Sequence, residues 1–260
     1  MKLVVALDLP TPEENLDLVR KLSTDGNILD IAYKVGFNTF VAAGPKFIED
    51  LKTISARYDD ALQHPKPEIC LDLKLYDIPN TMASTAERIT ELGVDLITIH
   101  ASAGEQGMRA VVDALKNIEN SPKVLAVTVL TSFTHEHCLR VYKEGRTNTT
   151  QSLAAEAITA GVDGIVCSSN DLETIRDIQD SLKPRPSIIK FVPGIELQPR
   201  DDDQKRKGTL KDVIQGGADY IVVGRPIYKD DNPCDVVSKI LEKIKIMEES
   251  WATFNETANW

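Results

Sequence analysis

The sequence predicts a single α/β domain folded as a closed (β/α)₈ barrel. Eight short apolar runs recur along the 260 residues, and each leads toward a stretch with helical character. Alternating strands and helices are typical of a parallel sheet, and eight repeats in a chain of this length favour a barrel. The runs cover residues 3–7, 31–35, 69–75, 95–100, 124–130, 164–167, 188–192 and 220–223.

Most of the connecting stretches carry the periodicity or the end signals of helices. Thr11 is the expected N-cap of the first helix, and Gly44 with Pro45 should interrupt the second near its start. The expected helices cover residues 12–22, 40–56, 81–92, 105–118, 150–160, 171–181 and 235–247. An open doubly wound sheet is the alternative, but no Gly-x-Gly-x-x-Gly follows the first run.

We expect the barrel to occupy residues 1–248 as one domain. No linker rich in Gly, Pro or Ser divides this part of the chain. Residues 249–260 form a C-terminal tail in which Trp251, Phe254 and Trp260 stand among polar residues. From Glu248 onward we expect irregular structure, either docked on the barrel or frayed.

Composition narrows the classes of function. The net charge is −10 and the pI is near 5.0, which argues against general binding to nucleic acid or to anionic membranes. A phosphorylated substrate then requires local positive groups. The N-terminus reaches Asp8 before a signal peptide could form, and the four cysteines include no Cys-x-x-Cys pair. We expect a cytoplasmic protein in which Cys70 and Cys167 are small buried hydrophobes.

The most informative stretch is residues 71–81. Apolar and polar residues alternate from position 71 to 75, so Asp72 and Lys74 should project from one face of a strand. Asp77 follows at the end of that strand, and Pro79 suits the first turn of the next helix. An exposed edge strand with a solvated charged face is the alternative. The neighbouring runs read as buried strands, which favours a charge cluster inside a site.

Other chemically capable residues also stand at the expected strand ends, which is where barrels of this kind place their active sites. These residues are Asp8, Lys34, His100, Ser132 and Arg225. Asp8 and Lys34 join the acids and lysine of residues 72–77 in an alternating set, in which each lysine offsets the cost of burying neighbouring carboxylates. His100 is expected to hydrogen-bond near the site.

The second half of the chain suggests a grip for a phosphate group. Gly224 and Arg225 end the eighth run, and a long polar loop covering residues 196–208 follows the seventh. Loops after strands seven and eight commonly bind phosphate in such barrels. Backbone N–H groups near Gly224 and the forked guanidinium of Arg225 would suit a phosphate monoester.

A metal centre is not expected. His135, His137 and Cys138 lie close together in a connecting segment, but no second cluster of ligands accompanies them. Common protein metal sites need three or four protein ligands.

The motif Asp72-x-Lys74-x-x-Asp77-Ile78-Pro79-Asn80-Thr81 resembles the signature of the orotidine 5′-phosphate decarboxylase family. The resemblance extends over nearly the whole chain. Its supporting matches are Ala6-Leu7-Asp8, Lys34-Val35-Gly36, His100-Ala101-Ser102, Leu130-Thr131-Ser132, Pro193-Gly194-Ile195, Asp203-Gln204 and Val223-Gly224-Arg225-Pro226.

The resemblance implies conversion of orotidine 5′-monophosphate to UMP without a cofactor, in pyrimidine biosynthesis. Lys74 would protonate the ring carbon that loses CO₂, within a network that includes Lys34, Asp72 and Asp77. The implied assembly is a homodimer in which residues of one subunit complete the partner's site. The implied substrate-binding residues are Asp8, Lys34, Ile78, Thr81, Ser132, Pro193, Gln204, Gly224 and Arg225, with Asp77, Ile78 and Thr81 acting in the partner's site and Gln198 an alternative to Gln204.

Glu196 departs from the resemblance, because many bacterial members have an arginine at this place. An acid should not contact phosphate, so that contact is absent or comes from another residue. Two other functions stay open. One is a Mg²⁺-dependent sugar-phosphate decarboxylase or aldolase of the same superfamily, which would lack Ile-Pro-Asn-Thr after the last Asp. The other is a non-catalytic nucleotide-binding barrel, which would be expected to have lost Lys74 or Asp72.

Overall fold

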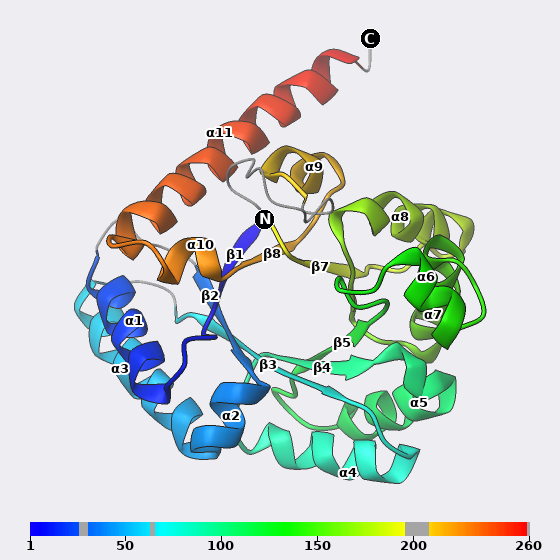
Figure 1. Ribbon diagram of the computed structural model, residues 1–260, viewed down its shortest axis with the longest axis horizontal. Helices are drawn as coiled ribbons and strands as arrows, with labels where there is room; N and C mark the ends of the chain where they lie inside the picture. The colour runs from blue at the N-terminus through cyan, green and yellow to red at the C-terminus, as the bar shows by residue number, and fades with distance from the viewer. Residues whose placement is uncertain (26–30, 63–65, 196–207, 259–260) are drawn as a thin grey trace.

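The computed structural model describes residues 1–25, 31–62, 66–195 and 208–258. Its eight strands are all parallel and form a closed barrel in chain order, with β8 paired to β1. Figure 1 shows the strands as an inner ring surrounded by helices. The prediction of a closed barrel over an open sheet is therefore confirmed. The strands are β1 (Lys2–Ala6), β2 (Ile31–Gly36), β3 (Glu68–Leu75), β4 (Leu96–His100), β5 (Lys123–Val127), β6 (Gly164–Val166), β7 (Ile189–Pro193) and β8 (Tyr220–Val223).

The helices of the outer layer overlap the predicted ones, although the second prediction stops short of Leu62 and further helices form at His135–Val141, Leu210–Gln215 and Arg225–Tyr228, where none was predicted. Thr11 caps α1 through a reciprocal pair of hydrogen bonds with Glu14, and Gly44 separates α2 from α3 as expected. The described α-helices are α1 (Pro12–Thr24), α2 (Phe37–Ala43), α3 (Pro45–Leu62), α4 (Pro79–Thr90), α5 (Gly104–Leu115), α6 (His135–Val141), α7 (Arg146–Ala160), α8 (Leu172–Ser181), α9 (Leu210–Gln215), α10 (Arg225–Tyr228) and α11 (Pro233–Ala258). None of the helices in the described ranges is both long and apolar enough to span a membrane.

The expectation of irregular structure after Glu248 is wrong, because α11 continues to Ala258. The apolar residues Ile244, Met247 and Trp251 recur at spacings of three and four, which is the helical period. Met247 and Trp251 line a groove against Ile214 of α9, and Figure 1 shows α11 running past that helix. The helix therefore continues where its residues pack against α9. The polar residues around Trp251 and Phe254 had led us to expect irregular structure there. The division into a barrel and a separate tail from residue 249 stays a prediction.

Buried apolar residues form two layers on either side of the strands. The larger layer lies between the strands and the helices, and the smaller one fills the inside of the barrel with residues such as Val4, Leu96 and Phe191. Cys70 and Cys167 are free and buried, as predicted. Because side chains fill the barrel interior, reactive groups can gather only at its ends.

A Gly-x-Asp sequence precedes three alternate strands and makes the same bonds each time. Asp95, Asp163 and Asp219 stand just before β4, β6 and β8. Each carboxylate accepts a 2.7 Å hydrogen bond from a backbone N–H at or near the start of the preceding strand. The N–H of each Asp donates back to the carbonyl of that same residue, at 2.9 to 3.0 Å. The three glycines all have positive φ, which a side chain would disfavour.

We predict that Asp163→Ala will lower the free energy of unfolding by about 1–3 kcal/mol while leaving kcat unchanged. The substitution leaves the partly buried Val124 N–H without its acceptor, and such a loss costs about that much. Asp163 lies at the amino-terminal end of the barrel, away from the strand ends that carry reactive groups. Urea unfolding would measure the change, with Asp177→Ala on the exposed face of α8 as the control. An unchanged stability would contradict the prediction.

Candidate active site

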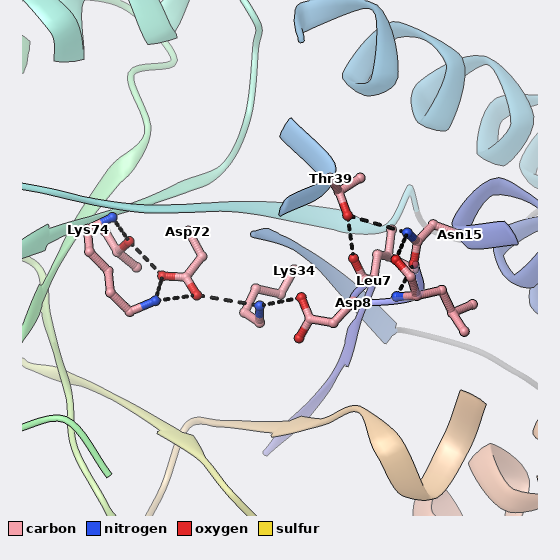
Figure 2. Close-up of polar contacts among 9 residues, drawn as sticks. Leu7, Asp8, Asn15, Lys34, Thr39, Asp72 and Lys74 are labelled. Carbon is pink, nitrogen blue, oxygen red and sulfur yellow. Dashed lines mark hydrogen bonds and ion pairs between the residues drawn. The ribbon is translucent and has the colours of Figure 1, made fainter. Parts of the chain in front are cut away.

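Four charged side chains from the first three strands form a continuous series of contacts at the carboxyl end of the barrel. The Lys34 Nζ atom is 3.2 Å from Asp8 Oδ1 and 3.4 Å from Asp72 Oδ2. The Lys74 Nζ atom is 2.8 and 2.9 Å from the two carboxylate oxygens of Asp72. Signs alternate along this charge chain of Asp8, Lys34, Asp72 and Lys74, which Figure 2 shows. Asp72 and Lys74 thus lie together as predicted, although not through the regular strand alternation on which the prediction rested.

The alternation keeps the inner members of the charge chain ionised although they are largely buried. Burial by itself raises the pKa of Asp72, which is 8% exposed, but the charges of Lys34 and Lys74 outweigh it. The net pKa of Asp72 is below its ordinary value. Burial by itself lowers the pKa of Lys34, but the carboxylates of Asp72 and Asp8 outweigh it and the net pKa is raised. At neutral pH the buried carboxylate of Asp72 therefore lies between the ammonium groups of Lys34 and Lys74.

We predict that Asp72→Asn will lower the free energy of unfolding at pH 7 by about 3 kcal/mol, because it leaves two lysines without their shared counter-ion. The folded pKa of Asp72 is depressed, so its contribution to stability is present above the unfolded value near 3.8 and is lost as pH falls through the folded value. The difference between variant and wild type should therefore shrink at pH 3. Urea titrations at both pH values would measure it, with Asp177→Asn as a surface control. An equal difference at the two pH values would contradict this assignment.

The strand that carries Asp72 and Lys74 is bulged at this point. Leu71 of β3 pairs with Ile97 of β4, and Leu75 pairs with Ile99, so three residues of β3 lie opposite one residue of β4. Lys74 adopts a left-handed backbone conformation with a φ of 46°, which is uncommon for a residue other than glycine. Bulges near active sites commonly re-aim a side chain. Here the bulge accompanies the turn of Lys74 onto Asp72.

Thr98 is the residue of β4 that faces the bulge. Its side-chain oxygen Oγ1 donates a hydrogen bond to Asp72 Oδ1 at 2.8 Å and accepts one from the Lys74 backbone N–H at 2.9 Å. Thr98 is only 1% exposed. The hydroxyl group therefore contacts the side chain of one member of the charge chain and the backbone of another.

The loop that carries Asp8 is held from its far side by two buried polar residues. Asn15 Oδ1 accepts a hydrogen bond from the Leu9 backbone N–H at 3.0 Å, and Asn15 Nδ2 donates to Thr39 Oγ1 at 3.3 Å. Thr39 Oγ1 in turn donates to the Leu7 carbonyl at 2.8 Å. Figure 2 shows these contacts behind Asp8. They fix the backbone on both sides of the carboxylate that pairs with Lys34.

Gly36 gives the outer pair of the charge chain the space it needs. A Cβ atom at this position would lie 3.2 Å from Asp8 Oδ1 and 3.2 Å from Lys34 Nζ. A larger residue at position 36 would therefore press on the ion pair between Lys34 and Asp8, which explains why glycine suits this position.

His100 lies at the end of β4, and its ring is 5.7 Å from that of Tyr76, centre to centre. Its Nδ1 atom accepts a hydrogen bond from the Ser102 backbone N–H at 3.2 Å, so a neutral ring carries its proton on Nε2. Burial and the nearby charge of Lys74 lower the pKa of His100. The histidine is therefore neutral at pH 7, and it makes the local hydrogen bond expected of it.

The second half of the barrel places several predicted residues at the same end. Ser132 is exposed in the loop after β5, and Pro193 is the last residue of β7. Gly224 precedes α10, and Arg225 is its exposed first residue. Ile195 pairs with Gly208, so the described residues on either side of positions 196–207 lie side by side. The predictions for Glu196, Gln198 and Gln204 fall within residues 196–207, outside the described residues.

The remaining motif residues are exposed to solvent. Asp77 is exposed, and its carboxylate accepts a 2.7 Å hydrogen bond from the backbone N–H of the next residue. The side chains of Ile78 and Thr81 are also exposed, Ile78 to 66%. Among the charged residues of the motif, Asp72 and Lys74 contact each other, whereas the carboxylate of Asp77 bonds to the neighbouring backbone.

His135, His137 and Cys138, which were considered as metal ligands, contribute to local packing and helix capping. Thr134 caps α6 in a reciprocal arrangement with His137, and Cys138 is fully buried. His135 packs against Gly145, where an added Cβ would lie 2.6 Å from the ring. Across the described ranges, no group of three or more His, Cys, Asp or Glu residues is placed to hold a metal ion.

Sequence reasoning missed Thr98, Asn15, Thr39 and the steric role of Gly36. For Thr98 a signal existed, because it stands two residues before His100 and so shares the inward face of an otherwise apolar run. Asn15 and Thr39 gave no such signal, because the contacts that bury them join segments far apart in sequence.

Comparison with known proteins agrees with this geometry. A profile described as the Orotidine 5′-phosphate decarboxylase / HUMPS family matches residues 1–240. The orotidine 5′-phosphate decarboxylase of a Nitratiruptor species is 42% identical over 245 residues, which cover 94% of this chain and 100% of the relative. The crystal structure of orotidine 5′-phosphate decarboxylase from Lactobacillus acidophilus is 30% identical, with a TM-score of 0.74 over 94% of this chain and 98% of that one. The corresponding structure from Pyrococcus horikoshii OT3 is 26% identical, with a TM-score of 0.69 over 94% and 99%. A match of this extent, together with the charge chain in β1 to β3, shows that the chain belongs to the orotidine 5′-phosphate decarboxylase / HUMPS family.

Proposed function

We propose that this protein converts orotidine 5′-monophosphate to UMP and CO₂, a step in pyrimidine synthesis, without a metal or organic cofactor. The observation that carries the proposal is the charge chain, in which Lys74 contacts both oxygens of a buried Asp72 while Lys34 holds the carboxylate from the other side. Relatives about 42% identical over their full length are orotidine 5′-phosphate decarboxylases, which supports this substrate.

The reaction breaks the bond between C6 of the pyrimidine ring and its carboxylate. The electron pair stays on C6, because the ring offers no obvious electron sink at that position. In our proposal the Lys74 ammonium stabilises the developing charge and then gives its proton to C6, leaving a C–H bond, a neutral amine and free CO₂. Solvent returns the proton to Lys74 before the next turnover.

Asp72 acts on the substrate before the bond breaks. Its depressed pKa keeps it anionic at neutral pH, so a substrate carboxylate placed beside it is repelled. That repulsion ends when CO₂ leaves, whereas the attraction between Lys74 and C6 grows. The arrangement therefore favours the transition state over the bound substrate. Lys34 and Asp8 hold Asp72 in place and offer polar groups for the ribose hydroxyls.

The phosphate group would bind at the same end of the barrel, next to β1, because β8 pairs with β1. Gly224 immediately precedes α10 and Arg225 is its first residue, so an exposed guanidinium stands at the amino-terminal end of the helix. We assign the phosphate contact to them, with Gln204 as an additional candidate. Ser132 after β5 and Pro193 of β7 would flank the pyrimidine between these two charged regions.

We also propose that two copies of the chain form a dimer across the ends of β2 and β3. Large apolar side chains are exposed in the segments that follow these neighbouring strands, with Phe37 exposed to 55%, Val41 to 80%, and Tyr76 and Ile78 each to 66%. Exposed apolar groups at this density favour a protein interface. In the proposed dimer Asp77, Ile78 and Thr81 enter the partner's site, which would explain why Asp77 stands apart from Lys74. The predicted cytoplasmic location stays a prediction.

Mixing two inactive variants would test the shared site. Lys74→Ala and Asp77→Ala each disable every site in their own homodimers, but a heterodimer contains one intact site. Random exchange of subunits should therefore restore about a quarter of the wild-type activity, as expected for a twofold assembly. No recovery from a mixture shown to contain heterodimers would contradict the assignment of Asp77 to the partner's site.

The proposed function itself is tested by incubating the purified protein with orotidine 5′-monophosphate and EDTA, and by following UMP and CO₂. We expect turnover that EDTA does not change. No turnover by folded, dimeric protein would contradict the proposal. Turnover of a ketohexulose phosphate that requires Mg²⁺ would instead identify the other activity of the superfamily.

A further inference from the structure

We propose that Thr98 is a positioning residue for the decarboxylation, which holds the Asp72 carboxylate and the bulged backbone of Lys74 in register through one hydroxyl group. This inference rests on the proposed function. It concerns a residue outside the signature motif, on the neighbouring strand β4, that contacts no reacting atom in the mechanism above.

The direction of the two hydrogen bonds leaves Thr98 a single arrangement. A backbone N–H can only donate, so Thr98 Oγ1 accepts the 2.9 Å bond from Lys74. A carboxylate can only accept, so the single hydroxyl proton points to Asp72 Oδ1 at 2.8 Å. The threonine is 1% exposed, so bulk solvent does not compete for either bond. Because both partners belong to adjoining parts of β3, the hydroxyl fixes the carboxylate relative to the lysine backbone.

The bulge makes this bond necessary. The ladder between β3 and β4 is regular at Leu71 and resumes at Leu75, and Thr98 is the residue of β4 that faces the gap. Lys74 has left the regular strand conformation, so its N–H needs an acceptor outside the ladder. Thr98 supplies that acceptor with its side chain. Without it, the left-handed conformation at Lys74 would lose the contact that stabilises it.

The charges around Asp72 show why a small displacement matters. Lys34 approaches the carboxylate from β2 at 3.4 Å, and Lys74 approaches from β3 at 2.8 Å. From β4 the uncharged Thr98 hydroxyl completes the shell, and the pKa of His100 beyond it is lowered, so that ring adds no charge at neutral pH. The buried thiol of Cys70 lies below and has a raised pKa. Thr98 is therefore the neutral donor that keeps Asp72 from turning wholly toward either lysine.

Thr98→Val tests the proposal, because valine keeps the shape of threonine and removes the hydroxyl. We expect kcat to fall roughly 10- to 100-fold, the cost of losing a hydrogen bond to a buried charge, while KM changes little. Thr98→Ser should restore most of the rate. The matched control is Thr128→Val, since Thr128 is also fully buried and its hydroxyl donates to the Val166 carbonyl at 3.0 Å. This control should lose comparable stability and keep its kcat.

Hydrogen exchange at the Lys74 backbone N–H gives a readout that does not depend on turnover. Exchange should be faster in Thr98→Val than in the wild type, Thr98→Ser or Thr128→Val. If Thr98→Val does not fold, Thr98→Cys takes its place, because a thiol has a similar size and makes only weak hydrogen bonds.

A full rate in Thr98→Val or Thr98→Cys would overturn the proposal, and so would a serine variant as slow as valine or a similar fall in kcat in Thr128→Val. A wild type without turnover would contradict the proposed function instead. In that case unchanged exchange at Lys74 in the valine variant would still overturn the positioning contact.

Discussion

Replacing Lys74 with alanine should lower kcat by at least about 10⁴-fold, because in the proposed mechanism the substitution removes both the proton donor and the cation that faces the developing carbanion. We do not expect Lys34 to take over, since its ammonium group is already paired with both Asp72 and Asp8. KM should change far less than kcat, because the proposed ribose and phosphate contacts remain. Steady-state kinetics with orotidine 5′-monophosphate would measure both constants.

Lys123→Ala is the matched control for this substitution. Lys123 is an exposed lysine at the start of β5, at the far end of the barrel, so its loss should leave kcat unchanged. A Lys74→Ala enzyme that keeps more than about a hundredth of the wild-type rate would exclude Lys74 as the proton donor. Circular dichroism and thermal unfolding would show that the variant is folded before the rates are compared.

Removing the phosphate group from the substrate should lower kcat/KM by at least about 10⁴-fold, although the phosphate lies far from the bond that breaks. Binding energy from a remote group can hold the reacting ring against Lys74 and Asp72, and a truncated substrate loses that contribution to the rate. The comparison is turnover of orotidine against its 5′-monophosphate. Similar values of kcat/KM would contradict a role for the phosphate in catalysis.

Arg225→Ala separates the phosphate contact from other effects of truncation. The variant should lose about 100-fold in kcat/KM toward the monophosphate, as expected for a charged contact, and less than about threefold toward orotidine. Equal losses toward both substrates would mean that Arg225 acts on the structure of the site and does not hold the phosphate.

Much of the fold and the inner part of the site could be predicted from local patterns. The eight runs and the strand-end rule placed Asp8, Lys34, Asp72 and Lys74 at one end of a barrel, because burial and the two-residue period are properties of short segments. The position of Asp77 relative to Lys74 was not predictable in this way, since it depends on how the chain leaves β3.

The features that escaped prediction depend on contacts between distant segments. The left-handed Lys74 and the bulge around it involve the register of β3 against β4, and no residue type in the stretch announces them. Likewise, Asn15 meets Thr39 only because α1 and α2 lie together behind β1. The end of α11 was missed for another reason, because its helical spacing was outweighed by the polar residues around Trp251.

The hydrogen-bonded Gly-x-Asp sequences before β4, β6 and β8 have a consequence for the evolution of this enzyme. They link β3 to β4, β5 to β6 and β7 to β8 at the end opposite the charge chain, and each uses only its own aspartate and one residue of the preceding strand. Substitutions in the loops at the catalytic end should therefore leave these hydrogen bonds intact. Mutational tolerance should be higher in the loops around the charge chain than at Asp95, Asp163 and Asp219, so that new substrate preferences can evolve while these three aspartates keep the barrel stable.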